Sequence, residues 1–304
     1  MATDLQTAVR YAVEHETRYE YSLPMNDGYT VAYLLPRPTP QQNVELALVD
    51  VTPEPDEREE RIDAFGNRVV QIGMHHQHDA LTVTARSEVV FEPLRLADYD
   101  EAAELPWEVA AEAVAELRGG AALQVRPFAG GLPMVATDGD RAELRRLVTS
   151  AFEPGRPIID AARAWCAAIH TQFDYDRSFT DTSTPLAAVL AARRGVCQDF
   201  AHVAVGGLRL LGLAARYVSG YLETEPPPGG TRQVGADASH AWCSVWVPSI
   251  GWIDFDPTNN HLPTHRHVTV AWGRDYGDVP PVRGIVIGPQ AEQTLTVNVT
   301  VTRR

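Results

Sequence analysis

The stretch RRGVCQDFAH, residues 193–202, constrains the fold most, because it separates two predicted helices. The preceding segment STPLAAVLAARRG predicts a helix with Thr184 as N-cap, Pro185 at the first helical position and Gly195 just past the last turn. A second helix is predicted to begin at Cys197. Its apolar face and its glycine stop are Phe200, Val203, Ala204, Leu208, Leu211 and Gly212. Cys197 is therefore expected at a helix N-terminus.

Strand patterns flank these helices. Short segments rich in Val, Thr and Tyr predict β structure from about residue 9 to 93, and ARYVSGYL, HAWCSVWV and WIDFDP predict three strands after the second helix. The stretch 96–117 predicts helix, and GGAALQVRPFAGGLP, 119–133, predicts a linker. We therefore expect a β-rich N-terminal domain at 1–95, a helical segment and linker at 96–137, a mixed core at 138–262 and a C-terminal β segment at 263–304.

Composition narrows the classes of function. The formal net charge of −14 disfavours binding to nucleic acid or to an anionic membrane surface. The chain has no apolar run near the ~20 residues that a membrane helix needs, and no secretory signal is expected at its N-terminus. Three widely spaced cysteines, Cys166, Cys197 and Cys243, contain no C-x-x-C pair and fit a reducing compartment. The sequence predicts a cytoplasmic protein.

The predicted position of Cys197, at a helix N-terminus, is typical of a cysteine nucleophile. The unpaired N–H groups and the dipole of a helix N-terminus favour a thiolate and can stabilise an oxyanion. The next two strands offer a base, His240 in HAWCSVW, and an orienting group, Asp254 or Asp256 in GWIDFDPT. Because side chains alternate along strands, an even register puts His240 opposite Asp256, whereas a shift of one residue separates them.

Each of these residues also has a structural interpretation. A buried cysteine usually packs in a core, and an aspartate before a proline can begin a turn. A zinc-dependent hydrolase that uses Cys197, His240, His202 and Cys243 is a weaker hypothesis. Alternation points Cys243 away from His240, and the spacing typical of zinc ligands is absent. We therefore expect no metal.

Two long motifs, GVCQDFAHVAVGGLRLLGLAARYVSGYL and ADASHAWCSVWVPSIGWIDFDPTNN, resemble the catalytic core of the bacterial transglutaminase-like superfamily. HETRYEY, LLPRP and DAFGN look like the N-terminal region of this subgroup, and VAWGRDYGDVPPVRG looks like its C-terminal segment. The resemblance implies an α+β fold: a papain-like transglutaminase core, with a helix-start cysteine packed on an antiparallel sheet, preceded by a β-rich, sandwich-like domain. It also implies a triad of Cys197, His240 and Asp256, and it favours Asp256 over Asp254.

Members of this family also need an oxyanion partner beyond the N–H group of the cysteine. The candidates are Tyr175, ranked first, and Gln172 and Gln198. Trp242 and Trp252 are candidates for the wall of a substrate cleft. The acidic loop from Glu223 to Asp237 leads directly into His240 and is expected to shape specificity.

The expected reaction is acyl transfer. Cys197 attacks a carboxamide or peptide carbonyl, forms a thioester and releases ammonia or an amine, with His240 as acid and then as base. Water as acceptor makes an amidase or cysteine protease, and a lysine amine makes a transglutaminase; the sequence leaves both open, as it leaves the oligomeric state. We expect a protein or peptide substrate and no cofactor, calcium included. The alternative is a non-catalytic interaction protein that retains the fold, against which the joint presence of all three triad residues argues.

Overall fold

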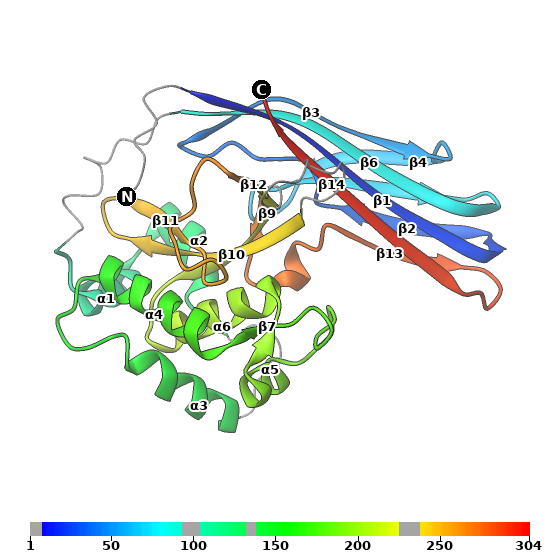
Figure 1. Cartoon of the computed structure of the whole chain (residues 1–304). Helices are drawn as coiled ribbons and strands as arrows, with labels where there is room; N and C mark the ends of the chain where they lie inside the picture. Colours follow the sequence, from blue (N-terminus) through cyan, green and yellow to red (C-terminus); the bar gives the residue numbers. More distant parts are fainter. Residues whose placement is uncertain (1–7, 93–103, 132–137, 225–237) are drawn as a thin grey trace, which may run out of the picture.

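Two four-stranded antiparallel sheets form a β-sandwich (Figure 1). The computed structural model describes residues 8–92, 104–131, 138–224 and 238–304. The first sheet has the strand order β14-β1-β6-β3, and the second has the order β13-β2-β5-β4. Their strands are β1 Val9–Met25, β2 Asp27–Ala32, β3 Gln42–Thr52, β4 Glu57–Ile62, β5 Arg68–Met74, β6 His78–Phe91, β13 Val282–Ile287 and β14 Gln293–Arg303. The β-rich, sandwich-like N-terminal domain predicted from the sequence is confirmed.

The last two strands, β13 and β14, belong to the same two sheets as the N-terminal strands. β14 pairs with β1 from Tyr11 opposite Arg303 to Tyr21 opposite Gln293, and β13 pairs with β2. A segment predicted as a separate C-terminal part therefore closes one edge of each sandwich sheet. The division of the chain at residues 95, 137 and 262 stays a prediction.

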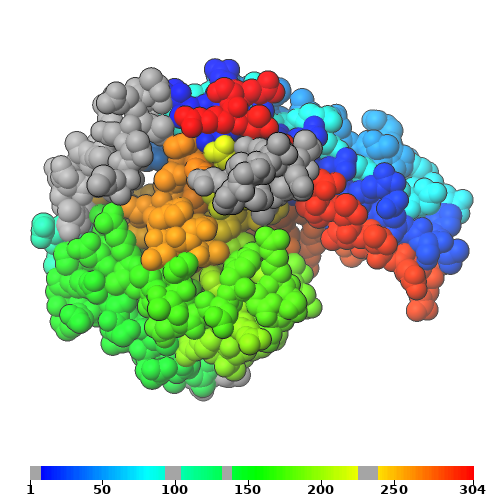
Figure 2. Space-filling model, in the orientation of Figure 1, coloured from blue at the N-terminus to red at the C-terminus, as the bar shows by residue number. Residues whose placement is uncertain are grey.

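One apolar face of the first sheet contributes to two cores. Along β1 and β6, buried and exposed side chains alternate, as expected for strands with one covered face. At one end this face packs on a third sheet, through Val9, Tyr11, Val89 and Phe91 against Tyr217, Tyr221 and Val268. Toward the other end it packs on the second sheet, through Leu81, Val83 and Ala85 against Val70, Ile72 and Met74. Only one end of the first sheet therefore covers the third sheet. In Figure 2 the blue, cyan and red parts of the sandwich extend past the green helical part.

The third sheet has the order β11-β10-β9-β12 and is antiparallel throughout. Its strands are β9 Ala215–Leu222, β10 Ala238–Val247, β11 Gly251–Phe255 and β12 His267–Gly273. The helices are α1 Trp107–Glu116, α2 Gly119–Val125, α3 Asp138–Thr149, α4 Ile158–Gln172, α5 Leu186–Ala192 and α6 Cys197–Leu210. In Figure 1 helices α3, α4, α5 and α6 lie below this sheet and the sandwich lies above it, whereas α2 lies level with β10 and β11. Two 3₁₀ turns, η2 Arg126–Phe128 and η3 Tyr276–Asp278, and the two-residue strands β7 Asp174–Tyr175 and β8 Arg194–Gly195 complete the described elements.

These elements give the α+β fold that the sequence predicts. Among the helices just described, none combines the length and the apolar character needed to cross a bilayer. The cytoplasmic location stays a prediction.

The helix boundaries next to Cys197 follow the prediction in part. α6 begins as predicted, and Gly212, at φ 85°, lies just beyond its end. The N-cap of α5, however, is Pro185 and not Thr184. The left-handed residue that ends α5 is Arg193, at φ 55°, so the prediction that Gly195 follows its last turn is wrong. Gly195 lies instead in β8, directly before the N-cap of α6.

The predicted linker at 119–133 is wrong for its first ten residues, which form α2 and η2. Paired glycines and a proline weaken a helix locally. Here burial outweighs that cost, because Val125 and Phe128 are 4% and 3% exposed. The Phe128 ring packs edge-on against Trp252, with centroids 5.3 Å apart.

Motifs far apart in the sequence meet where the sandwich joins the third sheet. Arg37, from LLPRP, lies 3.2 Å from the centroid of the Trp272 ring and donates a hydrogen bond to the Phe65 carbonyl (3.1 Å). Asn67, from DAFGN, bonds both backbone groups of Trp272, at 2.9 and 3.0 Å. Arg216 of β9 stacks on the same indole at 3.5 Å. These contacts fix how the sandwich meets the third sheet, and we name them the joint.

Gly220 tests the packing of β9 against its neighbours. A Cβ at this position would lie 2.2 Å from the Val268 carbonyl oxygen and 2.5 Å from the Trp242 ring. Gly220→Ala is expected to lower the free energy of unfolding by about 2 kcal/mol, because backbone and a buried indole must move apart. The control is Gly120→Ala in α2, whose Cβ would meet nothing within 4 Å; it should raise stability by about 0.5–1 kcal/mol. Urea unfolding measures both, and equal midpoints would contradict this account.

Candidate active site

The N-terminus of α6 places Cys197 half-buried beside the apolar cluster that the third sheet shares with the sandwich. The turn before it is fixed by Asp199, whose Oδ2 accepts hydrogen bonds from the Val196 N–H and the Thr180 hydroxyl, both at 2.8 Å. A Cβ at Gly195 would come within 2.6 Å of that oxygen, so only glycine leaves room for the carboxyl. Burial raises the pKa of Asp199, although these hydrogen bonds oppose the shift. The helix start is therefore held by side-chain contacts as well as by the helix itself.

The hairpin of β10 and β11 places His240 and Asp256 on one face. Ser244 pairs with Asp254, and the ladder ends where Cys243 pairs with Phe255. Continued by one residue, this register sets Asp256 opposite Trp242, the neighbour of His240 on that face. The register is even, as expected from the sequence, so His240 and Asp256 share one face. The expectation that Asp256 lies directly opposite His240 is wrong by two residues. The carboxylate reaches His240 diagonally.

The Asp256 carboxylate is fully buried and accepts five hydrogen bonds. Oδ1 accepts from the N–H groups of Thr258 (2.9 Å) and Asn259 (3.1 Å). Oδ2 accepts from Nε2 of His240 (2.8 Å), Nε2 of His267 (3.0 Å) and Nδ2 of Asn259 (2.7 Å). Burial alone would raise the pKa of this carboxyl, but the hydrogen bonds from His240 and His267 and the positive charge of His240 hold it well below its ordinary value. Asp256 is therefore a fixed anion.

His240 lies between that anion and the thiol. Its Nε2 faces Asp256, and Cys197 lies close enough to the ring to raise the pKa of His240. Burial, the largest single influence, lowers the pKa of His240; the hydrogen bonds and charges of Asp256 and Cys197 outweigh it, and the net pKa is about 10. The ring therefore stays protonated through neutral pH. The structure thus brings together Cys197, His240 and Asp256, and it pairs Asp254 with the Trp242 indole instead.

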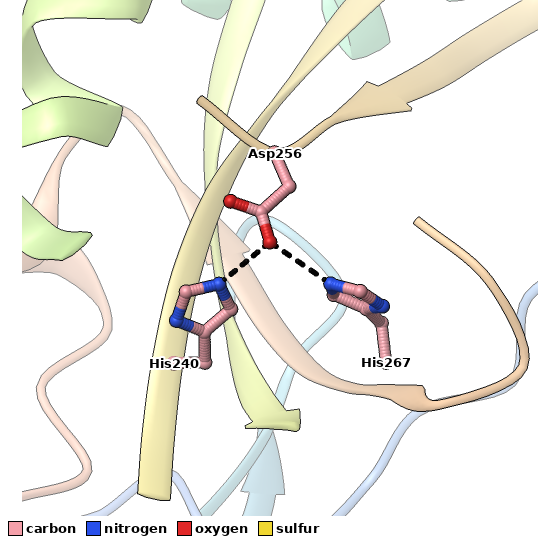
Figure 3. A group of neighbouring side chains, drawn as sticks. All are labelled: His240, Asp256 and His267. Atoms are coloured by element: carbon pink, nitrogen blue, oxygen red, sulfur yellow. Dashed lines mark hydrogen bonds and ion pairs between the residues drawn. The ribbon is translucent and has the colours of Figure 1, made fainter. Parts of the chain in front are cut away.

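His267, the first residue of β12, was not identified from the sequence. Figure 3 shows both imidazoles pointing at one oxygen of Asp256, each from its own strand. The side chain of His267 is 1% exposed. The segment HVTVAW does not indicate this role for His267. Its contact with Asp256 depends on the pairing of β12 with β9, which lies far upstream in the sequence.

The same three side chains bear on the metal hypothesis. One ligand atom each of His240, Asp256 and His267 lies within 4.8 Å of the others, a grouping from which a metal site could be built. However, Asp256 Oδ2 is already occupied by three N–H donors. The zinc set considered from the sequence is not assembled, because the Cys243 thiol donates to the Phe255 carbonyl (3.3 Å) and His202 Nε2 accepts from the Tyr276 N–H (3.1 Å).

The oxyanion candidates lie at three different places. Tyr175 pairs with Gly195 in the β7–β8 ladder, and its ring packs edge-on against Phe200 of α6, but its side chain is 48% exposed. Gln172 is the exposed last residue of α4. Gln198 is buried directly after Cys197. The choice among the three stays a prediction.

Trp242 does not fit the predicted role of a cleft wall. It is fully buried and donates its indole N–H to Asp254 (2.9 Å). Its ring packs edge-on against His267, with centroids 5.3 Å apart, and tilted against His240 at 6.0 Å. The indole therefore supports both imidazoles from inside the protein and has no surface to offer a substrate.

Trp252 is half-buried, with Phe128 at its edge and the Arg216 guanidinium 4.4 Å from its ring. Its predicted place in a substrate cleft stays a prediction. Residues 225–237, which make up nearly all of the acidic loop, lie outside the described residues.

Comparison with known proteins gives matches over most of the chain. Residues 11–90 match the bacterial transglutaminase-like N-terminal region, and residues 145–257 match the transglutaminase-like superfamily. An uncharacterized protein of Mycobacterium tuberculosis is 39% identical over 298 residues, which cover 96% of this chain and 92% of that protein. The protein-glutamine gamma-glutamyltransferase of Pseudomonas aeruginosa is 38% identical over 72 residues, which cover 23% of this chain and 11% of that protein.

A solved structure shares the fold. The crystal structure of a candidate cysteine protease from Cytophaga hutchinsonii superposes with a TM-score of 0.73 at 21% identity, over 98% of this chain and 91% of that chain. Together with the two family matches and the full-length relative, this confirms the resemblance read from the sequence motifs. The chain belongs to the transglutaminase-like superfamily and carries its bacterial N-terminal region.

Proposed function

We propose that this protein is a cysteine-dependent enzyme that cleaves or transfers the acyl group of a peptide bond or glutamine carboxamide through a thioester on Cys197. The observation that carries the proposal is the position of His240, which bonds a buried, fully hydrogen-bonded Asp256 (2.8 Å) and lies near enough to Cys197 for that side chain to raise its pKa. A nucleophile, a base and an orienting carboxylate in this order are what acyl transfer needs.

In the first half of the reaction, the Cys197 sulfur attacks the carbonyl carbon and a C–S bond forms. The tetrahedral oxyanion is stabilised by N–H groups at the start of α6. His240 gives a proton to the leaving nitrogen as the C–N bond breaks, and ammonia or an amine departs. In the second half, water or an amine attacks the thioester, His240 takes its proton, and the C–S bond breaks. Asp256 holds the ring in place and remains ionised throughout.

The substrate class that we propose is a protein or peptide, and the acceptor is either water or a primary amine. The relatives support both outcomes: one similar fold is that of a candidate cysteine protease, and a short stretch is shared with a glutamine gamma-glutamyltransferase. Purified protein, incubated with glutamine-containing peptides with and without a fluorescent primary amine, separates them. Amine incorporation identifies transfer, and ammonia or peptide release alone identifies hydrolysis.

Replacement of the nucleophile tests the mechanism. Cys197→Ala is expected to lower turnover by at least about 10³-fold, because no thioester can form. Cys166→Ala is the control, since Cys166 is buried in the helical core, and it should retain turnover within a few-fold. Turnover that survives Cys197→Ala would show that the nucleophile is assigned wrongly. If no turnover depends on Cys197, the result would favour the alternative, in which the chain is a non-catalytic interaction protein that retains the fold.

Alkylation tests the thiolate independently of any substrate. Because the pKa of His240 is about 10, its positive charge remains near Cys197 at about pH 6, and a neighbouring imidazolium makes a cysteine more reactive toward alkylation. Iodoacetamide at that pH should modify Cys197 at least about tenfold faster than Cys166 or Cys243, both buried. His240→Gln should remove most of this advantage. Peptide mapping by mass spectrometry gives the three rates, and similar rates for all three thiols would refute the thiolate.

A further inference from the structure

A second histidine holds the aspartate of the proposed triad. His267 Nε2 lies 3.0 Å from Asp256 Oδ2, and His240 Nε2 lies 2.8 Å from the same oxygen (Figure 3). The two rings come from β12 and β10, strands that do not pair with each other but flank β9 on either side. Asp256 is thus held from two strands, of which only one carries the base.

The hydrogen bonds of His267 define its proton. Its Nδ1 accepts from the Thr264 N–H (3.3 Å), so the ring proton is on Nε2, where it is donated to Asp256. Because Nδ1 accepts a hydrogen bond and carries no proton, the ring is neutral. Burial also lowers the pKa of His267, although the hydrogen bond and charge of Asp256 oppose this shift. His267 and His240 therefore differ in charge although they share one carboxylate oxygen.

β12 is anchored to the sandwich next to His267. Gln42 at the start of β3 donates to the Thr269 carbonyl (2.8 Å) and accepts from the Thr269 N–H (2.9 Å). Val268 and Val270 pack in the cluster shared with the sandwich. The backbone that carries His267 is therefore fixed from the N-terminal domain.

We propose that His267 is a positioning residue: by donating to Asp256 it keeps the carboxylate aligned on His240, and β12 supplies this support from the sandwich side. The inference rests on the proposed function, in which His240 is the base. A neutral donor suits the task, because it stabilises the anion without competing with the imidazolium for its charge.

The surroundings of Asp256 decide which other groups titrate with it. His240 faces it from β10 and His267 faces it from β12, and Cys197 of α6 lies near His240. The His261 ring lies 5.3 Å from His267, and Asp254 is bonded to Trp242. His170 of α4 bonds the Thr258 carbonyl (2.9 Å), two residues after the carboxylate.

The test compares two variants that lack a donor, His267→Phe and His267→Met, with His267→Gln, which retains one. The variants without a donor should lose about 10- to 100-fold in kcat with KM changed less than about twofold, because the base is misaligned but the substrate still binds. The acidic limb of the kcat profile should move to higher pH, since an Asp256 with fewer donors is protonated more easily. His267→Gln should recover most of both.

Alkylation of Cys197 at about pH 6 provides a readout that needs no substrate: it should slow in His267→Phe and recover in His267→Gln. If the wild type shows no Cys197-dependent turnover, the proposed function fails. The alkylation rates of Cys197 still test whether His267 positions Asp256 and His240. Equal kcat, acidic limb and alkylation rate in His267→Phe, His267→Met and wild type would overturn the proposal. So would an equal loss in His267→Gln, because the donor would then make no difference.

Discussion

The arrangement of the candidate site depends on one buried anion. Asp256 has no exposed surface and accepts five hydrogen bonds, from a loop that follows it and from histidines on two strands. An unpaired buried charge costs several kcal/mol, so each of these segments is stable only where it can donate to the carboxylate. The interaction that orients the base therefore also fixes β10, β12 and the turn after β11 relative to one another.

Local patterns were sufficient for the parts of the site that lie in single elements. Helical periodicity and the glycine stop placed Cys197 at the start of α6, and strand alternation placed His240 and Asp256 on one face. His267 was not predicted, because its contact with Asp256 depends on how β12 pairs with β9. Likewise, the apolar packing of Phe128 made a helical turn from a stretch whose glycines and prolines suggested a linker. Tertiary contacts decided both cases, and no short-range pattern encodes them.

The flanking motifs of the sequence acquire a physical role in the joint. LLPRP, DAFGN and VAWGR supply Arg37, Asn67 and Trp272, which hold the sandwich on the third sheet. Because Trp272 and His267 lie on the same strand, the contacts that join the two parts also support the proposed triad. The N-terminal region is therefore a structural part of the site and not an independent attachment.

The pairing of β14 with β1 has a consequence for how the chain is made. Tyr11 leaves the ribosome long before its partner Arg303, so during synthesis β1 has one open edge and an apolar face whose cover depends on the third sheet. An edge of this kind can recruit a strand from another nascent chain. A chain that lacked β14 would therefore leave this edge of β1 unpaired, and association with other chains would compete with folding.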